Sequence, residues 1–475
     1  MRGINIGAAM DATAPLCRLG VSVSLLHEAL VCRVVLRHNS GLSVACTGAS
    51  MLSRLFQPVV PAALAAIALS STLIGCANLA PSSTQSQVSG YRLRLIGETT
   101  LPHRMDAFGT TLGGISGIDY DEARDQYYLL ADDRSDLNAA RFYTAKIAVS
   151  AAGISVPNVT SVVTLKRPDG TPFGGKATGA TDIPDPESIR YRAETDTLLW
   201  TSEGDKTLGI DPSVREMKLD GTFIREMPTL PMFKMKAGDS GSRDNLTFEG
   251  ISLTVDGKGV WVSMEAALYA DGAEPTVDAV GGPARFTLYH ANSGNPIRQI
   301  AYIPDAIPLR PAEKGGADNG VTEILMMDQF RMLVLERSYS PGTGNSLRVY
   351  VIDTRDGTDV LNVTALKPGQ YTPVTKRLLV NFDTLGLKKL DNTEGMTFGP
   401  RMPNGNRTLV FVSDDNFRKS QITQFVAFEL TEPRSAAAYV VEPPTLWWPY
   451  PYYGFRPWYP HPYPRPIPRP MPKPP

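Results

Sequence analysis

The chain has 475 residues, of which 42% are hydrophobic and 20% are charged, and its formal net charge is −1. This composition is globular, and the balanced charge excludes the basic excess that is typical of nucleic-acid-binding proteins. All four cysteines lie before residue 77, so the rest of the chain has no disulfide framework, no thiolate metal site and no cysteine nucleophile.

Residues 1–50 show no repeat and no recognisable role. A signal peptide that begins at Met51 has an ordinary length, whereas one that begins at Met1 does not. We therefore expect residues 1–50 to be an upstream extension that is not native, and translation to begin at Met51.

Residues 51–75 predict a bacterial lipoprotein signal. A basic start that contains Arg54 is followed by a nearly apolar run from Val59 to Gly75, and the run ends in the lipobox Leu73-Ile74-Gly75-Cys76. Cleavage before Cys76 would allow acyl chains on its sulfur to anchor the protein in a membrane. An uncleaved transmembrane helix and an ordinary signal peptide are the alternatives. Residues 76–90 would then be the lipidated cysteine and a Ser/Thr-rich tether.

Residues 91–432 contain a phrase that recurs five times, with an acidic or hydroxyl residue, a short strand, a gap, an apolar strand and a further acid. In each copy we call the first acidic or hydroxyl residue the first mark and the later acid the second mark. The first marks lie 62 to 74 residues apart, at Ser116, Glu187, Glu249, Glu323 and Glu394. The second marks follow 13 to 20 residues later, at Asp132, Glu203, Glu265, Glu336 and Asp414. A long period of this kind indicates a repeat architecture in which equivalent residues occupy equivalent places.

The repeats predict an all-β fold, namely a β-propeller with five blades. Further strands after most hairpins alternate apolar and polar residues, or are wholly apolar, between turn residues. The fifth copy is followed by one strand too few to complete a blade. The segment Tyr91–Gly97, at the start of residues 91–432, can supply the missing strand by pairing with Gln424–Leu430. Such pairing closes the ring and removes free sheet edges. A sixth, degraded blade between Leu137 and Asp185 is the alternative.

Residues 443–475 are rich in proline and aromatic residues and hold no acid, but they include Arg456, Arg465, Arg469 and Lys473. Proline at alternate positions favours extended polyproline II over helix and sheet. The segment reads either as a disordered tail or as an arm that contacts anionic lipid, an envelope polymer or another protein.

The repeated acids are the best candidates for chemistry. In a propeller they would converge on the axis, where clustered carboxylates repel each other unless a cation lies among them. Carboxylate oxygens suit Ca²⁺. We expect metal ligands at four first marks, Glu187, Glu249, Glu323 and Glu394. We expect residues that position water at four second marks, Asp132, Glu203, Glu265 and Glu336. Arg134 and Arg337 lie beside these acids and would bind an anion.

A structural role for the same acids is the rival interpretation. A residue repeated in every blade often accepts hydrogen bonds from backbone N–H groups, and Asp-rich stretches often form tight loops.

Several phrases resemble the phytase-like family, also described as the esterase-like activity of phytase family. They are Gly113-Gly114-Ile115-Ser116-Gly117-Ile118, Asp185-Pro186-Glu187-Ser188-Ile189, Phe248-Glu249-Gly250-Ile251, Leu335-Glu336-Arg337-Ser338 and Asn392-Thr393-Glu394-Gly395-Met396. The resemblance spans about Tyr91 to Leu430. It implies an envelope or secreted β-propeller with phosphoesterase or esterase action and dependence on Ca²⁺.

The leading hypothesis is a lipid-anchored hydrolase of the outer membrane, facing the periplasm or the cell surface, that cleaves phosphate or other esters at a central acidic metal site. One rival is a non-catalytic propeller that binds a carbohydrate, lipid or protein of the envelope. Another is a propeller that acts on a small sugar or lactone. No nucleic-acid partner is expected.

Overall fold

The computed structural model describes residues 32–35, 43–46, 86–88 and 90–433. The chain divides into two compact units, Met1–Pro81 and Ser82–Pro475. In the first unit, β1 (Cys32–Val35) and β2 (Ser43–Cys46) form an antiparallel pair. The predicted lipobox with Cys76 and the proline-rich segment 443–475 lie outside the described residues. Among the described residues, no helix is long and apolar enough to cross a membrane.

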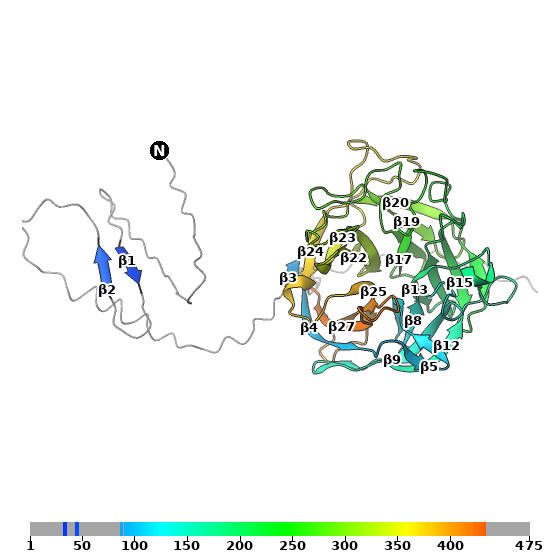
Figure 1. The fold of residues 1–475 in the computed structure, drawn as a ribbon, viewed down its shortest axis with the longest axis horizontal. Helices are drawn as coiled ribbons and strands as arrows, with labels where there is room; N and C mark the ends of the chain where they lie inside the picture. Colours follow the sequence, from blue (N-terminus) through cyan, green and yellow to red (C-terminus); the bar gives the residue numbers. More distant parts are fainter. Residues whose placement is uncertain (1–31, 36–42, 47–85, 89, 434–475) are drawn as a thin grey trace, which may run out of the picture. The chain divides into compact units, whose positions relative to one another are not determined.

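The second unit is a five-bladed β-propeller, as the repeats predict (Figure 1). From the axis outward, blade 1 holds β7 (Ile115–Asp121), β8 (Gln126–Ala131), β9 (Arg141–Lys146) and β12 (Asn158–Thr164). Blade 2 holds β13 (Pro186–Arg192), β14 (Thr197–Ser202), β15 (Ser213–Lys218) and β16 (Phe223–Glu226). Blade 3 holds β17 (Phe248–Leu253), β18 (Gly259–Met264), β19 (Ala284–His290) and β20 (Pro296–Tyr302).

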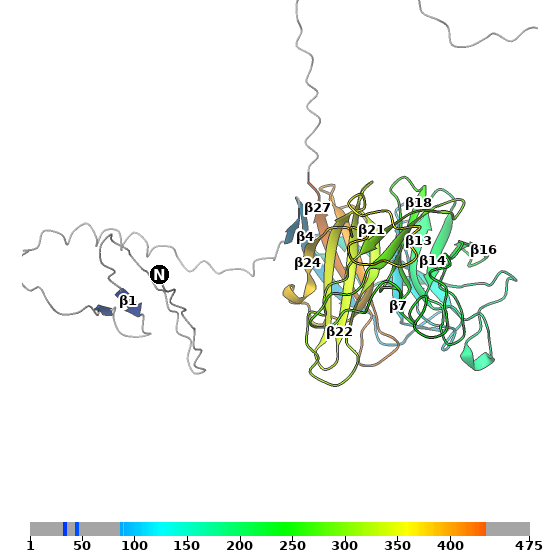
Figure 2. The same ribbon diagram turned by 90° about the horizontal axis from the view of Figure 1, so that it is seen from above.

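Blades 4 and 5 complete the ring, whose strands run between its two faces (Figure 2). Blade 4 holds β21 (Asp318–Met326), β22 (Arg331–Ser340), β23 (Gly344–Asp353) and β24 (Lys376–Asn381). Blade 5 holds β25 (Asn392–Gly399), β26 (Arg407–Asp414), β27 (Gln424–Thr431), β4 (Tyr91–Thr100) and β3 (Ser86–Val88).

The ring closes as predicted, by pairing the two ends of the body. Strand β27 is antiparallel to β4, with Phe428 opposite Leu95. The stretch proposed for a sixth blade contributes β9 and β12 to blade 1. Its other regular elements are the short hairpin of β10 (Val149–Ser150) and β11 (Gly153–Ile154) and the 3-10 turn η1 (Lys176–Thr178). A further small hairpin, β5 (Met105–Ala107) with β6 (Thr110–Leu112), follows β4, and the 3-10 turn η2 (Phe382–Thr384) follows β24.

The hydrophobic core consists mainly of five clusters, each between two neighbouring blades. Strand β8 shows why the second strands have apolar centres. Tyr127 and Leu129 pack against blade 5, whereas Tyr128 and Leu130 pack against blade 2. Because both faces of each blade are covered, alternation of polar and apolar residues is lost in the centres of the second strands.

Candidate active site

The inner strands β7, β13, β17, β21 and β25 each carry a β-bulge near the end where they begin. Bulges redirect side chains and recur beside active sites. In each inner strand, one residue directly follows the last paired residue before the bulge. These equivalent positions are Ser116, Glu187, Glu249, Thr322 and Glu394. Three of the five are therefore glutamates on strands that surround one axis.

A second set of equivalent positions lies on the second strand of each blade, one residue beyond the partner of the residue that precedes the bulge. These positions hold Asp132, Glu203, Glu265, Arg337 and Asp414. Four blades thus supply an acid, and blade 4 supplies a base.

Blade 4 departs from the predicted pattern by one residue. Thr322 takes the bulge position, and Glu323 takes the next one, which in three other blades is a glycine. A one-residue shift along a strand turns the side chain to the opposite face. Glu323 accordingly forms a buried ion pair with Arg190 at 2.7 Å and does not line the cavity that the other acids share.

Glu336 is displaced in the same way, because Arg337 occupies the position that acids hold elsewhere. Its carboxylate is buried among other polar groups between blades 3 and 4. It accepts hydrogen bonds from the Tyr302 hydroxyl at 2.5 Å, the Lys376 ammonium at 2.5 Å and the Asn319 amide at 2.8 Å. Its hydrogen-bonding capacity is therefore used within the protein.

Arg134 also lies beside the cavity rather than in it. Its guanidinium is 3.2 Å from Asp185 and 2.6 Å from Asp205. Both carboxylates are buried, so this arginine is held as a structural counter-ion and does not present a free fork to a ligand.

The remaining acids meet in an open cavity of about 580 Å³ at one face of the ring. Five of its lining residues are predicted acids, namely Asp132, Glu187, Glu203, Glu249 and Glu394. The other charged residues of the lining are Asp318, Arg337, Lys389, Asp391, Asp414 and Arg418. Glu265 is buried just behind it and pairs with Arg337 at 3.3 Å. Acids outnumber bases in this lining, so the cavity favours a bound cation.

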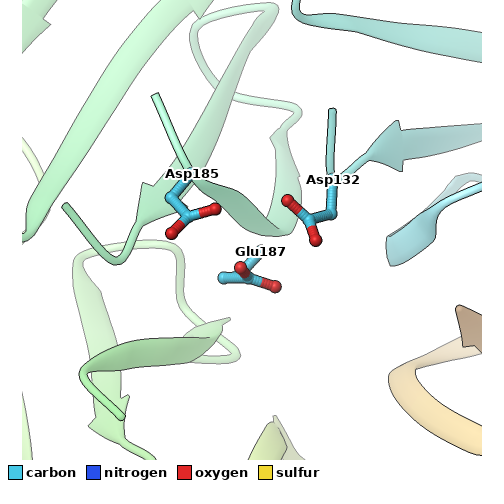
Figure 3. Close-up of side chains that lie close together, drawn as sticks. All are labelled: Asp132, Asp185 and Glu187. Atoms are coloured by element: carbon cyan, nitrogen blue, oxygen red, sulfur yellow. The ribbon is translucent and has the colours of Figure 1, made fainter. Parts of the chain in front are cut away.

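Two groups of carboxylates are close enough to share a cation. Asp132, Asp185 and Glu187 each offer an oxygen within 4.8 Å of the others, and their carboxyl groups face a common space (Figure 3). Glu187, Glu203 and Glu249 form a second such group, so Glu187 belongs to both.

Glu187 and Glu249 have no hydrogen-bond or ion-pair partner among the residues that the structure describes, although they are only 7% and 4% exposed. A buried carboxylate without a partner is costly unless a cation or a proton neutralises it. A set of carboxylate oxygens alone is the donor chemistry that Ca²⁺ prefers. The residues present therefore fit a hard divalent cation.

The pKa values of these carboxyl groups are raised. Burial raises the pKa of Asp132 to about 6, although the charge of Arg134 opposes it. Burial also raises the pKa of Glu203 and of Glu394 to about 7, and the charge of Asp132 adds to both shifts. The pKa values of Glu187 and Glu249 lie well above the ordinary range, first because of burial and then because of neighbouring glutamates.

Arg337 is the internal counter-ion of the cavity. Its guanidinium lies 3.1 Å from Asp318, 3.3 Å from Glu265 and 3.6 Å from Glu394. The sequence predicts that Arg337 binds an anion. Because three carboxylates already share its positive charge, little of that charge is left for a ligand.

Asp185 and the residues of the cavity mouth are absent from the predicted site. Asp185 stands two residues before Glu187 in a phrase that the sequence makes conspicuous, and this spacing could have identified it. Asp318 begins β21, and Asn392 begins β25 and the fifth phrase. The remaining mouth residues, within 389–391 and 416–421, come from loops to which nothing in the repeat points.

Comparisons with solved structures return weak matches. Hydrazine synthase of Kuenenia stuttgartiensis is 12% identical, with 65% of this chain and 79% of that chain covered and a TM-score of 0.32. An exo-β-1,3-galactanase of Phanerochaete chrysosporium is 10% identical, with 70% and 63% covered and a TM-score of 0.37. The catalytic domain of a GH62 α-L-arabinofuranosidase of Coprinopsis cinerea is 10% identical, with 72% and 98% covered and a TM-score of 0.38. Matches this weak say nothing about activity.

No protein of curated function matches the chain. The family model called phytase-like, with the description "esterase-like activity of phytase", matches residues 110–417. This range contains all five inner strands and the acids of the cavity. The chain therefore belongs to the phytase-like family.

Proposed function

We propose that this protein is a hydrolase that cleaves phosphate esters or other anionic esters in the central cavity with the help of bound Ca²⁺. One observation carries the proposal. The buried carboxylates of Glu187 and Glu249 have no partner among the residues that the structure describes, and they lie beside Asp132, Asp185 and Glu203. These five residues would hold the cation.

A bound divalent cation polarises an ester oxygen and lowers the pKa of water. The residues of the chain supply the rest. Glu394 is held by a hydrogen bond from the Asn392 amide at 2.7 Å and faces the same cavity. Burial raises its pKa to about 7 in the cation-free cavity, and once ionised its carboxylate is placed to accept the proton of the attacking water. The water oxygen would bond to the phosphorus or acyl carbon as the ester bond breaks, and Glu394 would return the proton to the leaving alkoxide, which departs as the alcohol.

The polar lining supports a small, water-soluble substrate. Leu390 is the single aliphatic residue among those that line the cavity in the described chain. Lipid-like or aromatic esters usually bind in predominantly apolar pockets, so this cavity favours charged or hydroxyl-rich substrates.

Assays of p-nitrophenyl phosphate, p-nitrophenyl acetate and phytate, with EDTA and then with excess Ca²⁺, test the proposal. We expect activity that EDTA removes and Ca²⁺ restores. The variant Glu187→Gln,Glu249→Gln should lose it while remaining folded, whereas Glu194→Gln, at an exposed acid away from the cavity, should retain it. Measurable Ca²⁺ binding without turnover of any ester would instead favour the non-catalytic binding module.

We also propose that Cys76 carries a lipid anchor that places the propeller in the cell envelope, with the tail 443–475 as a second contact. The tetrapeptide Leu73-Ile74-Gly75-Cys76 supports this proposal. Metabolic labelling with an alkyne fatty acid in a bacterial host should mark the protein, and Cys76→Ser should lose the label. A labelled Cys76→Ser variant would contradict the assignment.

A further inference from the structure

The cavity has three basic residues among its described lining, Arg337, Lys389 and Arg418. Arg337 is surrounded by carboxylates, and the ammonium of Lys389 pairs with Asp391 at 2.6 Å. The guanidinium of Arg418 is exposed and has no partner among the described residues. It is the one cation of this lining whose hydrogen-bonding capacity is unused.

Arg418 lies on the loop between β26 and β27, and buried Asp415 organises that loop. One carboxylate oxygen of Asp415 accepts hydrogen bonds from the backbone amides of Gly114 at 2.8 Å and Phe417 at 3.0 Å. The amide of Arg418 donates to the Asp415 carbonyl at 2.7 Å. Phe417 has a left-handed backbone with φ of 52°. Such a conformation persists only where surrounding contacts enforce it, so the loop has a defined shape.

The ring of Phe417 rests on the glycines that open the first repeat phrase. A Cβ on Gly114 would overlap the ring, and one on Gly113 would lie 3.1 Å from it. Gly114 also has φ of +61°, which a larger residue adopts with strain. The Gly113-Gly114 pair therefore provides the flat surface on which the loop is anchored.

The far end of the same loop is anchored as well. The Asp391 carboxylate accepts a hydrogen bond from the Ile422 amide at 2.8 Å, and Lys389 donates to the Ser420 carbonyl at 2.5 Å. Arg418 thus lies between two fixed points on the wall of the cavity. Little conformational entropy of the backbone remains to be lost when this side chain binds a ligand.

We propose that Arg418 is the residue that binds the anionic group of the substrate, and that Phe417 positions it by packing on Gly113 and Gly114. The inference rests on the proposed function, because it assigns substrate binding to the same cavity. A guanidinium can bind two oxygens of a phosphate or carboxylate at once. The acids deeper in the cavity would repel such an anion unless they hold a cation, so phosphate should bind only when Ca²⁺ is present.

Calorimetric titration with inorganic phosphate tests the assignment in the full-length protein saturated with Ca²⁺. We expect wild type to bind phosphate, Arg418→Ala to bind at least about tenfold more weakly, and Arg418→Lys to fall between them. Lys419→Ala, which removes an exposed charge next along the chain but outside the cavity lining, is the matched control and should bind like wild type. Equal phosphate affinity in wild type and Arg418→Ala, or no binding by wild type, would overturn the proposal.

The positioning role of Phe417 has its own readout. Phe417→Ala keeps the guanidinium but removes its anchor, so phosphate affinity should fall while Ca²⁺ affinity stays unchanged. In kinetics, both variants should raise KM for p-nitrophenyl phosphate more than they lower kcat. If Phe417→Ala binds phosphate like wild type, the loop does not position Arg418.

The phosphate titration separates this inference from the proposed hydrolase activity. Phosphate binding that depends on Arg418 in a protein without esterase activity would retain the inference and refute catalysis. Hydrolysis that depends on Ca²⁺ but not on Arg418 would support the proposed hydrolase activity and refute the role of Arg418.

Discussion

Arg190 and Glu323 form a buried ion pair that contacts all five inner strands. The guanidinium of Arg190 donates to the carbonyls of Ile118 on β7 and Met396 on β25, at 2.7 and 2.9 Å. The carboxylate of Glu323, on β21, accepts from the Ser188 hydroxyl of β13 at 2.7 Å and the Ile251 amide of β17 at 3.1 Å. The pair thus fills the axis of the ring and joins its blades.

Glu323→Gln should therefore destabilise the ring rather than impair cation binding. Removing one partner leaves the buried charge of Arg190 uncompensated, which costs about 3 kcal/mol or more. We expect a lower midpoint of urea unfolding, with Ca²⁺ affinity like that of wild type by calorimetry. Loss of Ca²⁺ binding in a folded Glu323→Gln protein would show that this residue is a metal ligand after all.

Glu187→Gln should have the reverse effect. In the absence of Ca²⁺ and at pH 8, where less of the site is protonated, it removes a buried charge that neighbouring acids repel, so the melting temperature in EDTA should rise above that of wild type. The stabilisation that Ca²⁺ gives to wild type should be greatly reduced in the variant. Scanning calorimetry with and without Ca²⁺ measures both effects, and a melting temperature in EDTA below that of wild type would count against the repulsion.

The stability of the cation-free protein should fall as pH rises from about 4.5 to about 7. Asp132, Glu203 and Glu394 have pKa values of about 6, 7 and 7, above the ordinary values of 3.8 for Asp and 4.5 for Glu. The folded state therefore binds more protons than the unfolded state, and this stabilising contribution is lost as pH rises through 6 to 7. Each tenfold increase in proton affinity corresponds to about 1.4 kcal/mol.

Added Ca²⁺ should remove this loss of stability, because the cation replaces the protons. Its affinity should increase over the same pH interval as the carboxyl groups ionise. Thermal melts in EDTA and in Ca²⁺ at several pH values check both statements. A melting temperature in EDTA that is constant or increases across the interval would contradict the assigned pKa shifts.

Arg337→Met should increase the affinity for Ca²⁺ several-fold while it lowers stability in EDTA. The substitution removes the counter-ion of Asp318, Glu265 and Glu394 and leaves the cavity more negative. If Arg337 bound the substrate anion instead, the variant would lose phosphate affinity as severely as Arg418→Ala. Parallel titrations with Ca²⁺ and phosphate distinguish the two roles.

The sequence predicts the architecture well because the repeat is a consequence of the fold. The phrase recurs since each inner strand meets the same axis, and the pairing of Tyr91–Gly97 with Gln424–Leu430 follows from one missing strand. Strands β15 and β16 of blade 2 are not predicted, because SVREMK and FIRE carry many charges; β16 is also the outer edge strand of its blade.

The site is predicted only in part, because a β-bulge cannot be seen in a single sequence. In blade 4 the sequence Val321-Thr322-Glu323 suggests that Glu323 is equivalent to the glutamates of the other blades. The strand register instead places Thr322 at the bulge. The same shift moves Glu336 away and brings in Arg337. Arg418 comes from a loop without any repeated signal, and its role depends on contacts with residues about 300 positions earlier.

The pairing of β4 with β27 also constrains how the protein can be made. Leu95 can find Phe428 only after nearly the whole body has left the ribosome, so the last blade stays incomplete throughout synthesis. Contacts between such distant segments slow folding and leave sheet edges open to aggregation in the meantime. A truncation anywhere before residue 424 should therefore yield an open, protease-sensitive arc rather than a smaller stable ring.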